Sequence, residues 1–169
     1  MSELMYPGAK KVAIVGMEID VTLTAQYNPK EISFEKSAEW APHKTTKNNG
    51  ADLEYSSSPA RTLSMELMFD GYEEDLDVSK EYVDKLMQLI EVMDADSNDE
   101  SRKRPSIVQV VWPEKATKFQ GVLQSVSTKY TMFNPDGKPV RATCNIKVLE
   151  VAKLREFLAK ASAKERSGW

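Results

Sequence analysis

A strict alternation of apolar and other side chains over residues 62–70 limits the fold of this chain more than any other feature. The inward positions of this stretch recur at every second residue, at Leu63, Met65, Leu67 and Phe69. A period of two places them on one face of a β-strand, because successive side chains of a strand point to opposite sides. The sequence therefore predicts a half-buried strand that ends at Asp70-Gly71.

Comparable stretches on both sides of this strand predict a mainly β protein. Apolar runs or alternating patterns that indicate strands occupy residues 12–15, 19–24, 32–40, 107–112, 119–133 and 140–148. The tetrapeptide Asn134-Pro135-Asp136-Gly137 predicts a hairpin turn between the last two, because proline presets one turn dihedral and glycine supplies a positive φ. Strands joined in this way are typical of an antiparallel β-barrel or a curled sandwich.

Helical periodicity occurs twice. Apolar side chains at three- and four-residue steps predict an internal helix over residues 77–94, with Asp77 or Ser79 as its cap. A second apolar stripe that begins at Val151 predicts a C-terminal helix. The predicted fold class is mainly β (α+β): a barrel or curled sandwich with one internal and one C-terminal helix. We expect residues 1–150 to form the β domain and residues 151–169 a helical extension.

Residues 41–61 form a long polar connection between predicted strands. They contain Pro42, an Asn-Asn-Gly turn signal, three consecutive serines and Pro59, with Leu53 and Tyr55 as a candidate brief strand. A loop longer than about 12–15 residues inside a compact domain usually has a function. We therefore predict that this segment is a binding arm.

The residue inventory leaves little room for catalysis. The 169 residues include one cysteine and one histidine, so an internal disulfide and a two-histidine metal site are excluded. Catalysis that depends on histidine would need His43, which has no carboxylate at a spacing that would orient it. Lys plus Arg number 23 against 26 Asp plus Glu, and this balance argues against binding to duplex DNA. We expect no enzyme activity, no cofactor and no metal.

The N-terminal residues indicate no targeting segment. Residues 1–8 contain an acid and an early Pro-Gly pair in place of the cations and apolar run of a signal peptide. We expect folding in a reducing cytosol, with Cys144 as a free thiol in the core. The methionines interpreted as core residues are Met65, Met68, Met87 and Met93.

Several stretches together resemble the tube-type proteins of contractile injection systems. Tyr27-Asn28-Pro29 resembles the family's F-N-P signature, and residues 61–70 (RTLSMELMFD) resemble its R-T-L-x-x-x-L-x-F-D strand. Residues 119–123 (FQGVL), 130–133 (YTMF) and 136–142 (DGKPVRA) are similar to its F-x-G-V stretch and its Y-x-x-F…D-G-x-P-V-R-A hairpin. These stretches follow the order and spacing of the family.

Within the family, the chain is most similar to the baseplate member, the tube initiator or hub adaptor of extracellular phage-tail-like particles, without the LysM module that many of these carry. The resemblance implies a homo-hexameric ring between a trimeric spike and the inner tube. It implies templating of tube polymerisation, with spike, inner-tube or second-initiator and other baseplate proteins as partners. It implies no nucleic acid and no membrane insertion. The particle would be assembled in the bacterial cytoplasm and would act outside the cell or anchored to a membrane.

The resemblance also selects the candidate family-motif and interface residues, which are Asn28, Pro29, Trp40, Pro59, Arg61, Asp70, Phe133, Gly137, Pro139 and Arg141. Local roles stay open for several of them. Pro29 and Gly137 suit turns, Asp70 and Arg141 suit an ion pair within the barrel, and Phe133, like Phe69, suits the core. The 41–61 segment is the candidate contact with an adjacent ring, and the 130–140 hairpin is the candidate lateral contact.

Alternative functions stay open beside the tube initiator. The main inner-tube protomer is the nearest, although the insert at residues 94–104 and the terminal helix favour the initiator. A monomeric β-barrel that binds a glycan or peptide would need an aromatic-lined pocket, for which Trp40 and Trp112 are candidates. A hydrolase would depend on His43 alone and is the weakest interpretation.

Overall fold

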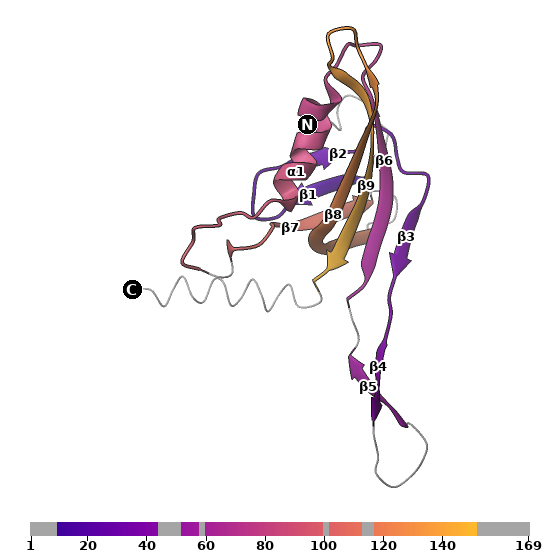
Figure 1. The fold of residues 1–169 in the computed structure, drawn as a ribbon, viewed down its shortest axis with the longest axis vertical. Coiled ribbons are helices and arrows are strands. Elements are labelled where there is room, and N and C mark those ends of the chain that lie inside the picture. Colours follow the sequence, from indigo (N-terminus) through magenta and orange to yellow (C-terminus); the bar gives the residue numbers. More distant parts are fainter. Residues whose placement is uncertain (1–9, 44–51, 58–59, 100–101, 113–116, 152–169) are drawn as a thin grey trace.

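The computed structural model describes residues 10–43, 52–57, 60–99, 102–112 and 117–151. Residues 152–169 of the predicted C-terminal helix and the candidate residue Pro59 lie outside these ranges. Within them, seven strands form one antiparallel sheet in the order β2-β1-β7-β8-β9-β6-β3 (Figure 1). The strands of this sheet are β1 (Ala13–Gly16), β2 (Thr22–Thr24), β3 (Ile32–Glu35), β6 (Thr62–Asp70), β7 (Ile107–Trp112), β8 (Thr117–Phe133) and β9 (Pro139–Glu150).

The predicted mainly β class is confirmed. The alternation predicted for residues 62–70 determines which face of the sheet is buried. Each inward residue of β6 lies opposite a buried residue of β9, in the pairs Leu63–Val148, Met65–Ile146, Leu67–Cys144 and Phe69–Ala142. A fully buried aliphatic or aromatic side chain contributes about 1.5–3 kcal/mol to stability. These four layers therefore form the centre of the core, and Cys144 is the buried free thiol that the sequence predicts.

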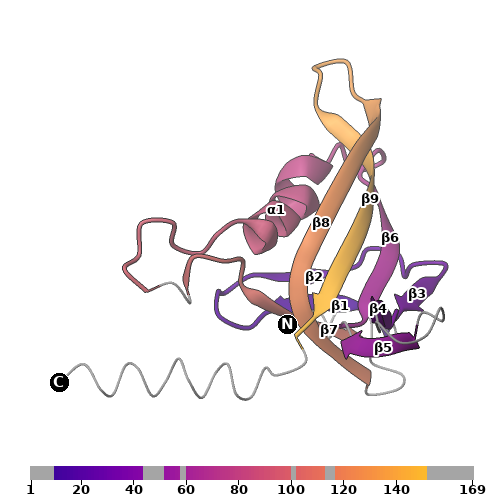
Figure 2. The same cartoon turned by 60° about the horizontal axis from the view of Figure 1, so that its bottom comes forward.

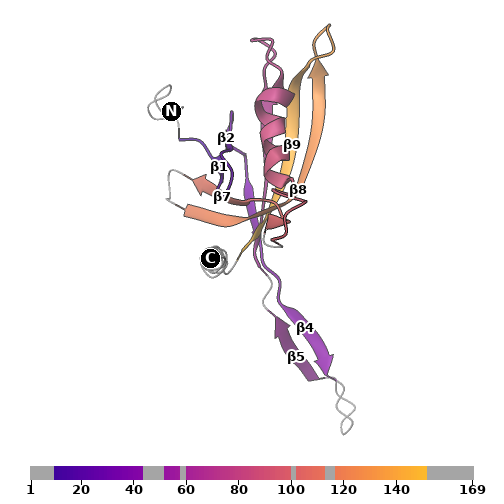
Figure 3. The same cartoon turned by 90° about the vertical axis from the view of Figure 1, so that its left-hand side faces the viewer.

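Strand β8 changes partner along its length, and this change bends the sheet. Residues 117–122 pair with β7, whereas residues 121–133 pair with β9. A register shift between Leu123 and Ser125 lies where β8 leaves β7. An extra residue in one strand bends that strand and increases its twist. Consequently β1, β2 and β7 run across the long strands β6, β8 and β9 (Figures 1 and 3).

The internal helix packs beside β8 and completes the core (Figure 2). It consists of a π-helical turn, η2 (Ser79–Val83), followed by α1 (Asp84–Ile90). Val78, Leu86 and Leu89 are fully buried. The ring of Tyr82 stacks on that of Phe69 with centroids 4.4 Å apart. Phe69 also lies opposite Ala142 of β9, so the helix packs on the Phe69–Ala142 layer of the core.

This helix is shorter than the predicted range of 77–94. Asp77 lies before it as a cap, since its carboxylate accepts hydrogen bonds from the first helical N–H groups. The helix ends at Ile90, because the backbone at the next position is extended, with a ψ of 150°. Met93 fits the helical spacing, but its backbone N–H donates to the carbonyl oxygen of Arg104 at 3.1 Å.

The connection predicted over residues 41–61 contains two strands among its described residues: the brief strand predicted at Leu53 and Tyr55 is confirmed as part of β5 (Asp52–Ser57), whereas the strand at residues 41–43 was not predicted. Strand β4 (Glu39–His43) pairs with β5 in an antiparallel ladder. We call these two strands the arm, which projects away from the sheet (Figures 1 and 3). Only a short alternation, Leu53 and Tyr55 between polar residues, marks this ribbon in the sequence. The strand predicted over 32–40 is likewise divided into β3 and the start of β4.

Candidate assembly surface

The two ends of the seven-stranded sheet are short edge strands. Among the described residues, β2 pairs only with β1, and β3 pairs only with β6. Three of the four residues of β3, namely Ser33, Phe34 and Glu35, are exposed. A strand with a partner on one side leaves backbone N–H and C=O groups that a further strand can pair with. Strand β3 is therefore an edge that another chain can extend.

Phe34 of β3 belongs to an aromatic cluster, which we call the basal cluster, at the end of the sheet where the arm leaves. Its ring centroid lies 5.8 Å from that of Phe119 on β8 and 6.4 Å from that of Trp112 on β7. Phe119 is buried, whereas Phe34 is 51% exposed. Phe34 thus packs on the core with one part of its ring and presents the rest to solvent beside the free edge.

Arg61 and Glu150 fasten this basal end. Nε of Arg61 donates to Oε2 of Glu150 at 3.0 Å, and Nη2 donates to Oε1 at 2.6 Å. The guanidinium carbon of Arg61 lies 5.6 Å from the ring centroid of Phe119. Hydrogen bonds and charge raise the pKa of Arg61 and lower the pKa of Glu150. Because Arg61 follows the arm and Glu150 ends β9, the pair fixes the point where the arm leaves the sheet.

Asp70 and Arg141 form the ion pair that the sequence predicts, at the opposite end of the β6–β9 ladder. Nε and Nη2 of Arg141 both donate to Oδ2 of Asp70, at 3.1 and 2.9 Å. A hydrogen bond from the backbone N–H of Tyr72 lowers the pKa of Asp70, and Arg141 lowers it further against the effect of burial. The side-chain amide of Gln26 makes two hydrogen bonds to the Asp70 backbone, at 2.7 and 2.8 Å. This amide ties the segment after β2 to β6.

The Asn28 side chain holds the turn between β2 and β3. Its Oδ1 accepts a hydrogen bond from the N–H of Val12, and its Nδ2 donates to the carbonyl oxygen of Lys10, each at 2.9 Å. Pro29 follows it and is partly buried. A proline keeps the preceding residue out of helical geometry, so this motif pair has a structural role in the turn.

The turn between β8 and β9 forms as predicted, but one of its residues was misassigned. Gly137 has a φ of +82°, and its N–H donates to the carbonyl oxygen of Asn134 at 3.0 Å. Pro139 begins β9 opposite Phe133. Phe133 is 56% exposed, so its interpretation as a core residue is wrong, whereas Phe69 is buried. The register shift between Leu123 and Ser125 moves the inward positions of β8 from odd to even residue numbers, so the alternation that buries Phe119 and Leu123 does not reach Phe133.

Other exposed apolar residues also differ from expectation. Trp40 on β4 is 56% exposed, so it does not serve as a core residue. Met68 and Met87 are 46% and 42% exposed, and their interpretation as core residues is wrong. Met68 lies on the outward side of the β6 alternation, while Met65 is in the core as expected.

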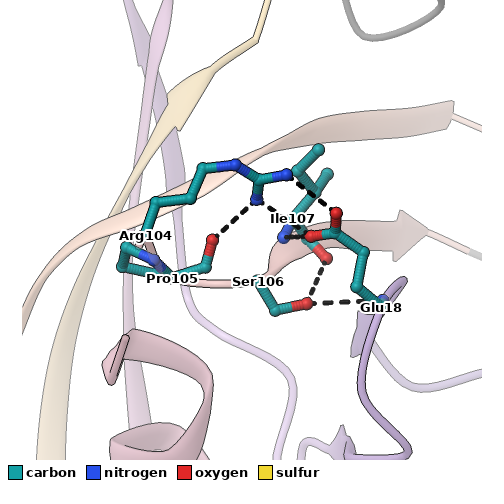
Figure 4. Close-up of polar contacts among 5 residues, drawn as sticks. All are labelled: Glu18, Arg104, Pro105, Ser106 and Ile107. Carbon is teal, nitrogen blue, oxygen red and sulfur yellow. Dashed lines mark hydrogen bonds and ion pairs between the residues drawn. The ribbon is translucent and has the colours of Figure 1, made fainter. Parts of the chain in front are cut away.

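A polar clamp that sequence reasoning missed joins the β1–β2 connection to the start of β7 (Figure 4). The Glu18 carboxylate accepts hydrogen bonds from Nη1 and Nη2 of Arg104, at 2.9 and 2.8 Å, and from the N–H of Ile107 at 2.8 Å. Burial opposes the ionisation of Glu18, but these hydrogen bonds outweigh it and lower the pKa of Glu18. The two charged residues are 86 positions apart, and no local spacing indicates such a contact.

Reactive chemistry has little support in the part of the chain that the structure describes. Those residues contain no group of three or more His, Cys, Asp or Glu side chains placed to hold a metal ion. Burial raises the pKa of the Cys144 thiol, which disfavours the reactive thiolate. The backbone of His43 is paired in β4 with that of Asp52. No helix among the described residues has the length and apolar character needed to cross a membrane.

The free edge of β3, the basal cluster and the arm are features through which a protein binds other protein surfaces. No curated protein matches the chain. A sequence model of the family described as contractile injection system tube protein matches residues 10–158, a range that includes all the strands and the helix. The chain belongs to the family of contractile injection system tube proteins.

Proposed function

We propose that this chain is a non-enzymatic ring component of a contractile injection system, which connects the central spike to the inner tube and templates tube polymerisation. The observation that carries the proposal is the exposed edge strand β3, with the half-exposed Phe34 and the arm beside it. A head-to-tail contact repeated between copies closes into a ring when its rotation fits. A ring on the spike would give later subunits a formed edge to add to.

The segment between α1 and β7 supports the tube initiator over the main inner-tube protomer. Val92 and Pro105 form a bridge across this segment. The Glu18–Arg104 clamp ties it to the β1–β2 connection. The described parts of this segment, residues 91–99 and 102–106, would give a ring an additional surface for a spike or baseplate protein. A protomer that stacks on copies of itself needs no such surface.

The test is co-expression of the chain with its cognate spike protein, followed by electron microscopy of the purified particles. We expect one six-fold ring on each spike. A bare spike beside a well-folded monomer would contradict the proposal. Long tubes formed by the chain alone would assign it instead as the main inner-tube protomer.

A matched pair of variants locates the contact. Phe34→Glu places a charge beside the free edge, and Met87→Glu places the same charge on the exposed side of α1. Circular dichroism first establishes that both variants are folded. We expect Phe34→Glu to abolish the ring on the spike and Met87→Glu to preserve it. Ring formation by both variants would show that β3 does not form the interface.

A further inference from the structure

Three backbone irregularities meet at one end of the molecule. Asp75 has a φ of +50° and is the one non-glycine residue in the left-handed region among the described residues. The π-helical turn η2 begins at Ser79, and β8 shifts register twice between Tyr130 and Phe133. Left-handed residues and π-turns each cost free energy and persist where surrounding contacts hold them.

Side-chain contacts connect these irregularities across the fold. Oδ1 of Asp75 accepts a hydrogen bond from Nδ2 of Asn134 at 2.7 Å. Nζ of Lys138 donates to Oδ2 and to the backbone carbonyl oxygen of Asp75, each at 3.0 Å. The hydroxyl groups of Ser79 and Tyr130 lie 3.0 Å apart. We call the contacts among Asp75, Asn134 and Lys138 the tip latch.

The turn beyond the register shifts has its own hydrogen bonds, from the N–H of Asn134 to the carbonyl oxygen of Lys138 and from the N–H of Lys138 to Oδ1 of Asn134, each at 2.9 Å. Its attachment to the rest of the sheet is weaker. Past Arg141, the β8–β9 ladder contains the single pair Phe133–Pro139, and proline has no N–H to donate. Phe133 is 56% exposed, so it packs no core. Figures 1 and 2 show this tip extending past the end of the helix.

We propose that residues 131–139 form a hinged tip, which pivots at the register shifts of β8 and is held in the observed position by the tip latch. The left-handed backbone of Asp75 opposes the latch, because Asp75 can relax once its carboxylate is released. Because the two effects oppose each other, the free energies of the latched and released positions differ little. The latch sets the direction of the aromatic pair Tyr130 and Phe133, whose ring centroids are 6.3 Å apart. This inference stands apart from ring formation.

Native-state hydrogen exchange of the full chain tests the hinge. Lys138→Met removes the ammonium donor of the latch, keeps most of the side-chain stem and leaves the hydrogen bond from Asn134 to Asp75 in place. We expect roughly 5-fold faster exchange at the turn amides of Asn134 and Gly137, because the latch residues Asn134 and Lys138 also accept the hydrogen bonds of these amides and the released turn opens more often. Exchange at Cys144 and Ile146 should stay at the wild-type rate. The control Lys129→Met removes an exposed β8 lysine outside the latch and should change none of these rates.

Two outcomes would overturn the hinge. Wild-type exchange rates at Asn134 and Gly137 in both Lys138→Met and Asp75→Gly, which removes the latch carboxylate, would mean that the tip is rigid without the latch. Equal acceleration at the turn and at Cys144 would mean that the latch stabilises the whole sheet and not a separate tip.

A second pair of variants tests the opposing strain. Asp75→Ala and Asp75→Gly both remove the carboxylate, but only glycine adopts a positive φ without cost. The reporter is the amide of Leu76, which donates to the carbonyl oxygen of Gly71 at 2.9 Å. We expect this amide to exchange roughly 5-fold faster in Asp75→Ala than in Asp75→Gly, because only alanine favours leaving the left-handed region. Equal rates would contradict the strain at Asp75.

Discussion

The β6–β9 ladder ends in an arginine–carboxylate pair on both sides, and the two pairs differ in how they are built. At the basal end, Arg61 and Glu150 make a two-point contact with both carboxylate oxygens, backed by the ring of Phe119. At the other end, Arg141 directs two nitrogens to one oxygen of Asp70, whose backbone is also bound by Gln26.

This difference shows what each end fixes. The basal pair joins the residue after the arm to the last residue of β9, so it sets where the arm leaves the sheet. The other pair joins β6 to β9, and Gln26 joins β6 to the chain after β2. Together these contacts stabilise the curvature of the sheet. In both places the charged motif residues hold strands of the fold together, and we propose that the exposed aromatic residues near them form the contact surface.

Gly121→Ala should break the basal end and have the largest effect on stability. A Cβ at this position would lie 2.1 Å from the carbonyl oxygen of Leu149, a backbone atom that cannot move without disturbing β9. We expect a loss of about 3 kcal/mol or more in the free energy of unfolding, from overpacking against the backbone. Urea denaturation followed by circular dichroism measures it.

Gly137→Ala is the matched substitution at the other end. A Cβ there meets nothing within 4 Å, and only the positive φ opposes it. We expect a loss of about 1–2 kcal/mol. A loss at Gly121 no larger than at Gly137 would contradict the close approach of β8 and β9 at the base.

Glu18→Gln tests a third arginine–carboxylate pair, Glu18–Arg104, which is less exposed than the two pairs at the ends of the ladder. The side chains of Glu18 and Arg104 are both 22% exposed, against 48% for Arg61 and 36% for Arg141. We expect a loss of about 1–2 kcal/mol at pH 7, because the amide replaces a charged acceptor of three hydrogen bonds. Urea denaturation of the variant and the wild type over pH 3–7 measures it.

The pH dependence of this loss follows from the direction of the pKa shift. The pKa of Glu18 is lower in the folded chain than the ordinary value of 4.5. Its stabilising effect is therefore complete above about pH 4.5 and is lost as the pH falls through the lowered pKa. The stability difference between wild type and Glu18→Gln should shrink over that range. A difference that stays constant down to pH 3 would contradict the clamp.

Much of the fold, but little of the surface, could be predicted from the sequence. Alternation identified β6 and β9, because each has one face against the core. It indicated only the brief strand at Leu53 and Tyr55 in the arm. It misplaced Phe133, because the register shift between Leu123 and Ser125 changes which residues of β8 face the core. The contacts Glu18–Arg104 and Gln26–Asp70 join residues 86 and 44 positions apart, so they depend on the fold and leave no local pattern.

Double-mutant cycles compare the two terminal pairs directly. One cycle combines Arg61→Met with Glu150→Gln, and the other combines Arg141→Met with Asp70→Asn. We expect coupling energies of about 1 kcal/mol for the basal pair and about 0.5 kcal/mol for the other, because solvent screens both and only the first is a two-point contact. A larger coupling energy for Arg141–Asp70 than for Arg61–Glu150 would contradict the stronger pairing that we expect at the basal end.

Trp40→Ser and Phe133→Ser should have the smallest effects on the stability of the isolated chain. Both side chains are 56% exposed, and we expect a change below about 0.5 kcal/mol for each. Thermal denaturation measures the change. A loss several times larger at either position would show that its ring is part of the core and not of a contact surface.

The central claim is that the free edge of β3 joins copies of this chain into a ring. Cryo-electron microscopy of the chain bound to its spike, at a resolution that traces the backbone, tests it most directly. We expect a six-fold ring in which the β3 edge of each copy is covered by its neighbour. A ring in which β3 faces solvent, or a spike that carries no ring, would contradict the claim.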